Sequence, residues 1–188
     1  MSSSRTNSFA TGFRGKFGNL FVLTQRRGKS LMGKLPELSS KEPTAKQVAV
    51  KEKFLAATEY ARRILMNPYY RELYSARGAG MKTGYNVAVG DYFKPPKVTA
   101  INPSAYHGNA GDEIRVKAID DFKVIRVHVT LRDMANAVLE FGDCVQTEDG
   151  SDWVYTVTAD HTPIEGQQVK AVAYDIPGNT GEMVCPVE

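Results

Sequence analysis

The 188-residue sequence lacks most signs of an exported, membrane-bound or disulfide-stabilised protein. It has only two cysteines, Cys144 and Cys185, which are too few for a disulfide framework in a chain of this length. We therefore expect both to be reduced and to fill space as small apolar side chains. No apolar run approaches the roughly 18 residues of a membrane span. The N-terminal segment also lacks the apolar core, about 7 to 15 residues long, of a secretory signal peptide. The expected location is therefore cytoplasmic or virion-associated.

The sequence is equally poor in catalytic motifs. Its three histidines, His107, His128 and His161, have no metal-ligand spacing, and neither cysteine has a histidine nearby. The glycines near residue 15 lack the order of a phosphate-binding loop. Paired carboxylates are expected only on exposed turns, where no burial would raise their pKa. We therefore expect no enzyme, no cofactor and no small-molecule substrate.

Charge is distributed unevenly along the chain. Residues 1–34 carry seven basic residues and no acidic residue, a net charge of +7, and residues 35–77 add a net charge of +3. Residues 78–188 have the opposite balance, with nine basic and sixteen acidic residues and a net charge of −7. The two ends can therefore attract one another or select different partners.

The first part of the chain predicts a flexible basic arm followed by a basic β-hairpin. Residues 1–15 show little apolar periodicity and are interpreted as the arm. β-prone residues follow at 17–24 and 30–35, and Gly28 between them can adopt the positive φ of a tight turn. Because a two-stranded hairpin is marginal in water, we expect it to pack on the following helices or on another subunit.

Helical signals follow, within a predicted module that spans residues 16–94. Thr44 with Gln47 fits a capping box, and apolar residues then recur at spacings of four and three. This apolar stripe consists of Val50, Phe54, Ala57, Ala61 and Ile64. Asn67-Pro68 predicts the start of a second, tyrosine-rich helix, and residues 85–93 predict a third short helix or turn. The double proline Pro95-Pro96 is expected to end the module.

Beyond the double proline the apolar period changes to two, which is typical of half-buried strands. About seven short strands fit into residues 98–188, and this number and spacing indicate an antiparallel β-sandwich with Greek-key connections. The residues expected to face inward are Ile114, Val116, Ala118, Ile125, Val127, Val129, Leu131, Trp153, Tyr155, Val157, Val169, Ala171 and Ala173. The predicted fold class of the whole chain is α+β: an N-terminal β-hairpin with two or three short helices, then the sandwich.

Three segments resemble a known family: AIDDFKVIRVHVTLRD at 118–133, DWVYTVTA at 152–159 and VKAVAYDIPGNTGE at 169–182. They are similar to bacterial immunoglobulin-like domains, in which an Asp follows one strand and a D-x-x-G-N turn follows a later one. This resemblance covers residues 98–188 and implies a spacer, adhesive or assembly module without activity. The N-terminal GKFGNLFVLTQRRGK, followed by PTAKQ, resembles a group of uncharacterised bacterial and phage-related proteins with a G-K-x-G-N basic hairpin.

Acidic turns are expected to gather at one pole of the sandwich, where the chain enters it. In such a sandwich the loops at 120–122, 148–152 and 175–179 lie at the same end. Calcium takes about six to eight oxygen ligands. The candidate ligands are Asp120, Asp121, Asp175 and Asn179. Alternatively, Asp175 and Asn179 hydrogen-bond their own turn and the other acids are solvated. In a third interpretation the pole docks the cations of the hairpin.

These patterns favour a non-enzymatic structural or adaptor protein, and the second resemblance links it to phages. It would form a homo-oligomer or a larger assembly through its basic module and project the sandwich. The candidate contact residues are Lys16, Asn19, Arg26, Arg27 and Lys29 of the hairpin and Tyr69, Tyr70 and Tyr74 of the second helix. Aromatic residues are enriched at interfaces, but these tyrosines fit a small helical core equally well. The alternative from a different class is a nucleic-acid-binding protein, in which the same basic residues contact phosphates.

Overall fold

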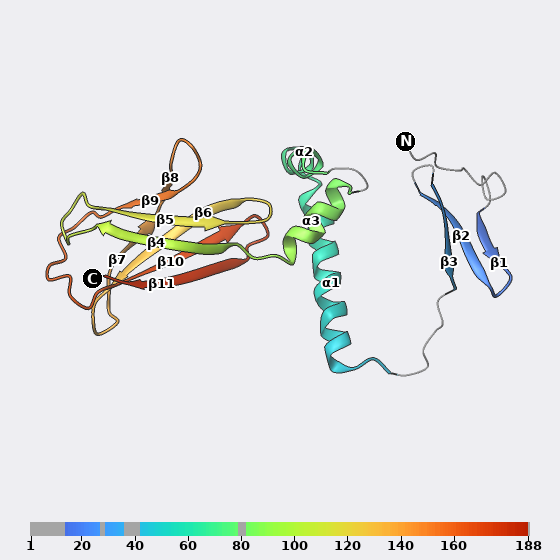
Figure 1. Ribbon diagram of the computed structural model, residues 1–188, viewed down its shortest axis with the longest axis horizontal. Coiled ribbons are helices and arrows are strands. Elements are labelled where there is room, and N and C mark those ends of the chain that lie inside the picture. Colours follow the sequence, from blue (N-terminus) through green and yellow to red (C-terminus); the bar gives the residue numbers. More distant parts are fainter. Residues whose placement is uncertain (1–13, 27–28, 36–41, 79–81, 188) are drawn as a thin grey trace, which may run out of the picture. The chain divides into compact units, whose positions relative to one another are not determined.

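The structure is a computed structural model that describes residues 14–26, 29–35, 42–78 and 82–187. These residues form three helices and eleven strands in three antiparallel sheets (Figure 1). The chain divides into two compact units, Met1–Glu52 and Lys53–Glu188. Most of the predicted arm lies outside the described residues. Within the described part of the chain, no helix is both long and apolar enough to span a membrane.

The first unit contains a three-stranded sheet in the order β1-β2-β3. Strands β2 (Phe21–Arg26) and β3 (Lys29–Lys34) form an antiparallel hairpin, and β1 (Gly15–Phe17) pairs with the other edge of β2. The single strand expected over residues 17–24 is therefore wrong. Gly18 adopts a φ of 56° and turns the chain between β1 and β2, because this left-handed conformation suits a residue without a Cβ atom. The turn residues 27–28 lie outside the described residues.

Helix α1 (Ala45–Ile64) begins at the predicted capping box. The Thr44 backbone N–H donates to Gln47 Oε1 over 2.9 Å, and the Gln47 N–H donates to Thr44 Oγ1 over 3.4 Å. Two N–H groups at the helix start are thus satisfied by the reciprocal pair. The predicted apolar stripe is unevenly buried, since Ala57 and Ala61 are fully buried whereas Val50 and Phe54 are exposed.

Two shorter helices complete the helical part. Helix α2 (Pro68–Ala76) is capped by Asn67, whose side chain accepts from the Tyr69 N–H, and Thr83 caps α3 (Gly84–Tyr92) in the same way. The buried residues of the small helical core are Tyr60, Ala61, Tyr74 and Ala88. The ring of Phe122, which belongs to a turn of the sandwich, packs against this core. Helices and sandwich therefore share buried surface within the second unit.

The remaining eight strands form two sheets that pack face to face as a β-sandwich (Figure 1). One sheet has the order β4-β5-β9-β8 and the other β11-β10-β6-β7. The strands are β4 (Lys97–Ala105), β5 (Glu113–Ile119), β6 (Val124–Arg132), β7 (Val138–Asp143), β8 (Val145–Gln146), β9 (Trp153–Thr156), β10 (Gln168–Asp175) and β11 (Thr180–Pro186). The chain changes sheets at Cys144, because β7 pairs with β6 in one sheet and β8 with β9 in the other.

The residues that alternation predicted to face inward belong to the core of the sandwich, except Ile125, and Ala118 among them is only partly buried. The core also includes Tyr106, Cys144 and Val187, which the alternation did not predict. Ile125 is 51% exposed. The register between β6 and β10 shifts there, since Tyr174 pairs with Arg126 and Asp175 pairs with Val124. Ile125 is thus the extra residue of a β-bulge, which turns its side chain outward. Val124 packs on the core in its place.

Candidate carboxylate site between the helices and the sandwich

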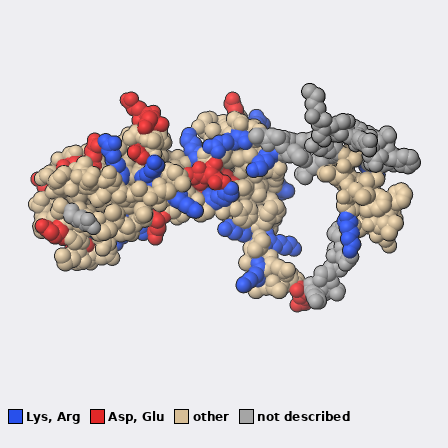
Figure 2. Space-filling view, in the orientation of Figure 1, with Lys and Arg blue, Asp and Glu red and all other residues tan. Residues whose placement is uncertain are grey.

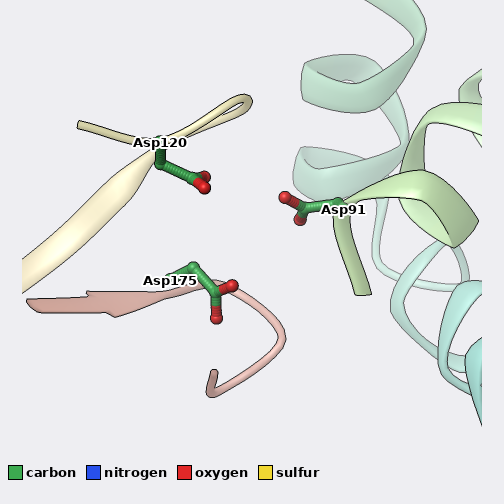
Figure 3. A group of neighbouring side chains, drawn as sticks. All are labelled: Asp91, Asp120 and Asp175. Carbon is green, nitrogen blue, oxygen red and sulfur yellow. The ribbon is translucent and has the colours of Figure 1, made fainter. Parts of the chain in front are cut away.

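Three carboxylates meet where the helices pack on the sandwich. Asp120 follows β5, Asp175 is the last residue of β10, and Asp91 lies near the end of α3. One oxygen of each lies within 4.8 Å of the others, and Figure 3 shows the side chains pointing toward a common centre. The predicted acidic pole therefore brings Asp120 and Asp175 together, and a helical residue that the prediction did not include joins them.

Asp91 is buried at the end of α3, and only one of its two carboxylate oxygens has a hydrogen-bond partner among the described residues. It is only 4% exposed, and its Oδ2 accepts a 2.6 Å hydrogen bond from the Tyr74 hydroxyl. The Tyr74 hydroxyl lies 2.8 Å from that of Tyr60, so a short chain of hydroxyls ends on the acid. Asp91 Oδ1 has no hydrogen-bond partner among the described residues. Burial raises the pKa of Asp91 to about 7, although the Tyr74 hydrogen bond lowers it.

Asp175 is held by Asn179 in the turn that follows β10. The backbone N–H of Asn179 donates to Asp175 Oδ1 over 2.6 Å, and its side-chain amide donates to Oδ2 over 2.7 Å. The same amide donates to the carbonyl of Tyr92 over 3.3 Å, which ties the turn to the end of α3. Asp175 is 1% exposed, and burial raises its pKa. The expected Asx-type hydrogen bonding is thus present, with Asn179 as the residue that orients Asp175.

Asp120 and Asp121 are neighbours that face different surroundings. Asp120 Oδ2 accepts from the backbone N–H groups of Phe122 and Lys123, whereas its buried Oδ1 has no partner among the described residues. Asp121 is exposed and pairs with Lys94, whose hydrogen bond and charge lower the pKa of Asp121. Asp121 is therefore outside the carboxylate group. Figure 2 shows acidic atoms at this junction with Lys and Arg atoms beside them.

The expectation that these acids would all be exposed, with no raised pKa, is wrong. Asp91 and Asp175 are buried because α3 covers the end of the sandwich. Asp91 was missed because its partners are distant in sequence. Its place as the single acid of a short, mostly apolar helix, directly before Tyr92 and Phe93, is the feature of the sequence that sets it apart.

The acidic loop at 148–152 does not join the carboxylate group. Asp149 accepts from the Thr147 hydroxyl over 2.6 Å and from the Ser151 hydroxyl over 2.8 Å, which lowers the pKa of Asp149 to about 2. Figure 1 shows the connection between β8 and β9 standing out from its sheet. Its acids are therefore used in their own turn or solvated.

The predicted contact residues occupy different environments. Lys16 lies in β1 and Asn19 in the turn after it, and both are exposed. Arg26 and Lys29 lie opposite one another in the backbone register at the end of the β2–β3 hairpin. Arg27 lies outside the described residues. The tyrosines of α2 also differ. Tyr69 is 61% exposed and makes an edge contact with Tyr70, whereas Tyr74 is fully buried and belongs to the helical core.

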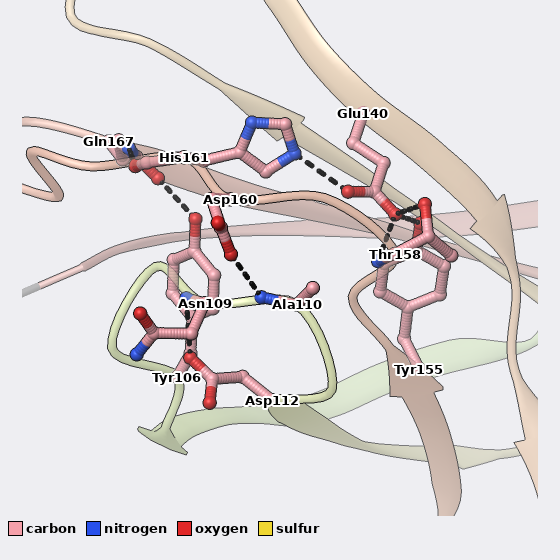
Figure 4. A network of polar contacts seen from close by, with 10 residues as sticks. All are labelled: Tyr106, Asn109, Ala110, Asp112, Glu140, Tyr155, Thr158, Asp160, His161 and Gln167. Carbon is pink, nitrogen blue, oxygen red and sulfur yellow. Dashed lines mark hydrogen bonds and ion pairs between the residues drawn. The ribbon is translucent and has the colours of Figure 1, made fainter.

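A second polar network lies in the sandwich and centres on Glu140 of β7 (Figure 4). Glu140 Oε1 accepts from the Tyr155 hydroxyl over 2.6 Å and from the backbone and hydroxyl of Thr158, both over 2.8 Å. Glu140 Oε2 lies 2.7 Å from His161 Nε2. Burial alone would raise the pKa of Glu140, but these hydrogen bonds outweigh it and lower the pKa to about 2. The network therefore holds an ionised carboxylate in a structural role.

Two open clefts flank the carboxylate group. Asp91 lines one of about 410 Å³, together with Arg77, Lys82 and Lys94. Asp120 lines another of about 460 Å³, beside Pro95. Asp91 and Asp175 are thus buried and Asp120 is half-buried, but the group remains close to solvent.

No protein-family model matches the chain, and no curated protein matches it. Among solved structures, the chain is similar to a tetra-tandem repeat from the extending region of a large adhesion protein. That match has 17% identity and a TM-score of 0.36 and covers 49% of this chain and 23% of the other. An engineered protein matches with 13% identity and a TM-score of 0.32, over 54% of this chain and 25% of the other. None of these comparisons supports the resemblance of the N-terminal half to phage-related proteins.

Proposed function

We propose that the protein is a structural or adaptor protein without enzymatic activity, which self-assembles through its N-terminal part and projects an immunoglobulin-like sandwich. The observation that carries this proposal is the uneven burial of the apolar stripe on α1. Ala57 and Ala61 are fully buried, whereas Val50 is 67% and Phe54 is 54% exposed. One face of the helix is thus covered toward its C-terminal end and mostly exposed toward its N-terminal end, where the Phe54 ring stacks on that of Phe93.

A second copy of the chain would cover this exposed end. Leu55 adds exposed apolar surface to α1, and the sheet of the first unit exposes Phe17, Leu20 and Met32. Large exposed apolar patches on soluble proteins mostly mark interaction sites, and most soluble oligomers consist of identical chains. Because apolar contacts carry little charge, self-association through them should withstand salt.

The strand order supports an immunoglobulin-like identity for the sandwich. Orders β4-β5-β9-β8 and β11-β10-β6-β7 correspond to the ABED and GFCC′ sheets of such domains. Domains of this architecture serve many functions, so the fold itself favours only a projecting spacer or recognition module. The relation to phages and the cytoplasmic or virion location stay predictions.

Light scattering of the full-length chain after size exclusion tests self-assembly. The expected mass is a multiple of the chain mass at both low and high salt. Val50→Asp, in the exposed part of the stripe, should reduce the mass to that of a monomer. Val145→Asp is the matched control, because Val145 is 74% exposed on β8 of the sandwich and should tolerate the charge. A monomeric wild-type chain at working concentration would overturn the proposal.

The same samples test nucleic-acid binding. Anisotropy of labelled DNA and RNA oligonucleotides is measured over a range of salt concentrations. Affinity that falls steeply with salt and is lost when Arg26 and Arg27 are changed to alanine would support the alternative function. If that binding accompanies a monomeric chain, it replaces the proposal of self-assembly.

A further inference from the structure

The three carboxylates at the junction lie close together in a largely buried place. Like charges this close repel strongly where burial excludes water. One oxygen of each carboxylate lies within 4.8 Å of the others. Of the cations beside this pole, Lys94 pairs with the exposed Asp121 and Arg77 donates to the backbone carbonyl of Asp121. Neither of these two cations bonds to Asp91, Asp120 or Asp175.

Two unpartnered oxygens point to a ligand. Asp91 Oδ1 and Asp120 Oδ1 are buried and have no hydrogen-bond partner in the described part of the chain. Asp91 is 4% exposed, and Figure 3 shows its carboxylate aimed at Asp120 and Asp175. A buried polar atom without a partner is costly, so each one requires an explanation. A ligand held between the three side chains would satisfy both oxygens at once.

We infer that Asp91, Asp120 and Asp175 bind a calcium ion that fastens α3 to the end of the sandwich. Calcium binds oxygen at about 2.3 to 2.6 Å, so opposite ligands lie about 4.6 to 5.2 Å apart. The three carboxylate oxygens lie within 4.8 Å of one another and fit inside such a sphere. Water from the flanking clefts would complete the coordination. Magnesium is usually held by only one or two carboxylates, which makes it the weaker fit.

Hydrogen bonds already orient two of the ligands. The Tyr74 hydroxyl holds Asp91 by Oδ2, which leaves Oδ1 without a partner among the described residues. Asn179 donates to both oxygens of Asp175, and each oxygen keeps a further lone pair for a metal. Such outer partners fix the orientation of metal ligands. In this arrangement Asn179, which was expected to bind calcium itself, is a positioning residue.

Calcium binding should stabilise the fold, because the three ligands come from three elements and meet only in the folded chain. The inference does not depend on self-assembly. Full-length protein is treated with chelator at pH 8 and then titrated with CaCl₂ by calorimetry. We expect one ion per chain. At about 100-fold excess over the dissociation constant, the melting temperature should rise by about 5 to 10 °C.

Terbium provides a second readout, because tyrosine sensitises the luminescence of this calcium substitute at short range. Tyr74 contacts Asp91, so excitation of tyrosine should produce terbium emission that calcium displaces. Asp91→Asn and, separately, Asp120→Asn should abolish both the emission and the calcium-dependent rise in melting temperature. Glu148→Gln is the matched control, because Glu148 is an exposed acid in the loop that does not join the group.

Two results would overturn the inference. The first is wild-type protein with the same melting temperature in calcium and in chelator and no heat of binding. This result would mean that a proton neutralises the carboxylates. The second is calcium binding that persists in Asp91→Asn and in Asp120→Asn, which would place the ion elsewhere. The wild-type comparison needs no variant, so it remains decisive even if Asp91→Asn fails to fold.

Discussion

The ring of Phe122, in the turn after β5, stacks on the ring of Tyr74 in α2 with centroids 4.3 Å apart. The Arg77 guanidinium lies over the Phe122 ring at 5.7 Å and donates to the carbonyl of Asp121 over 2.9 Å. A turn of the sandwich thus fills part of the helical core. The helices and the sandwich are joined by packing as well as by the carboxylate group.

Phe122→Ala should loosen this junction. Truncating a buried phenylalanine costs about 3 to 5 kcal/mol, and because Phe122 is only partly buried we expect a loss of about 2 kcal/mol in urea unfolding. Hydrogen exchange should rise in α2 and α3. Phe141→Ala serves as the control, since Phe141 is 67% exposed on β7 and should cost little. Equal losses for the two variants would contradict the proposed role of Phe122.

Tyr74→Phe removes the hydroxyl that donates to Asp91 and keeps the ring. The variant leaves another buried oxygen of Asp91 without a partner, so we expect a loss of about 1 to 3 kcal/mol in the free energy of unfolding. The measurement is made by urea titration in the presence of chelator. Tyr69→Phe, at an exposed tyrosine of the same helix, should have no measurable effect. If Tyr74→Phe left the free energy of unfolding unchanged, the hydrogen bonds of the Tyr74 hydroxyl would contribute nothing to stability.

Glu140 should make the sandwich sensitive to acid. Its pKa is lowered in the folded chain from the ordinary value of 4.5 to about 2, so the unfolded chain binds more protons between these values. The stabilisation is complete above pH 4.5 and is lost as the pH falls toward 2. Glu140→Gln should lower the melting temperature at pH 7 and flatten its decline in acid. Glu165→Gln, at an exposed position, should reproduce the wild-type profile.

Gly181→Ala tests a close approach between two backbones. A Cβ atom at Gly181 in β11 would collide with the carbonyl of Pro96, which lies just before β4. Backbone cannot move aside as a flexible side chain can, so we expect a loss of more than about 1 kcal/mol in the free energy of unfolding. The matched control is Gly90→Ala in α3, where a Cβ atom would meet open space. That change should stabilise the helix by up to about 1 kcal/mol. A stable Gly181→Ala chain would show that the two strands can separate without cost.

Local patterns predicted much of the secondary structure and core. Alternation along β10 correctly predicted that Val169, Ala171 and Ala173 are buried, because the side-chain period of a strand is a local property. The Thr44–Gln47 pair marked the start of α1 for the same reason. The bulge at Ile125 depends on how β6 pairs with β10, and no pattern within β6 encodes that register.

The sequence predicted two of the three residues of the carboxylate group, Asp120 and Asp175, but not Asp91. Asp120 follows β5 and Asp175 ends β10, and the connectivity of a sandwich places such strand ends together. Asp91 and Phe122 act across the junction, so their roles depend on how α3 and α2 pack on the sandwich. The exposure of Val50 likewise depends on where the helical core ends. Contacts of this kind arise from tertiary packing and leave only weak traces in a single sequence.

The double proline Pro95-Pro96 is not the structural boundary of the sandwich, because residues on both sides of it pack together. A fragment cut there would retain Asp120 and Asp175 but lose Asp91, and the ring of Phe122 would be left in water without the Tyr74 ring that covers it. Helices α2 and α3 therefore act as a cap on the strands and not as a mere tether. Anyone who transplants this sandwich into another scaffold should carry those two helices with it.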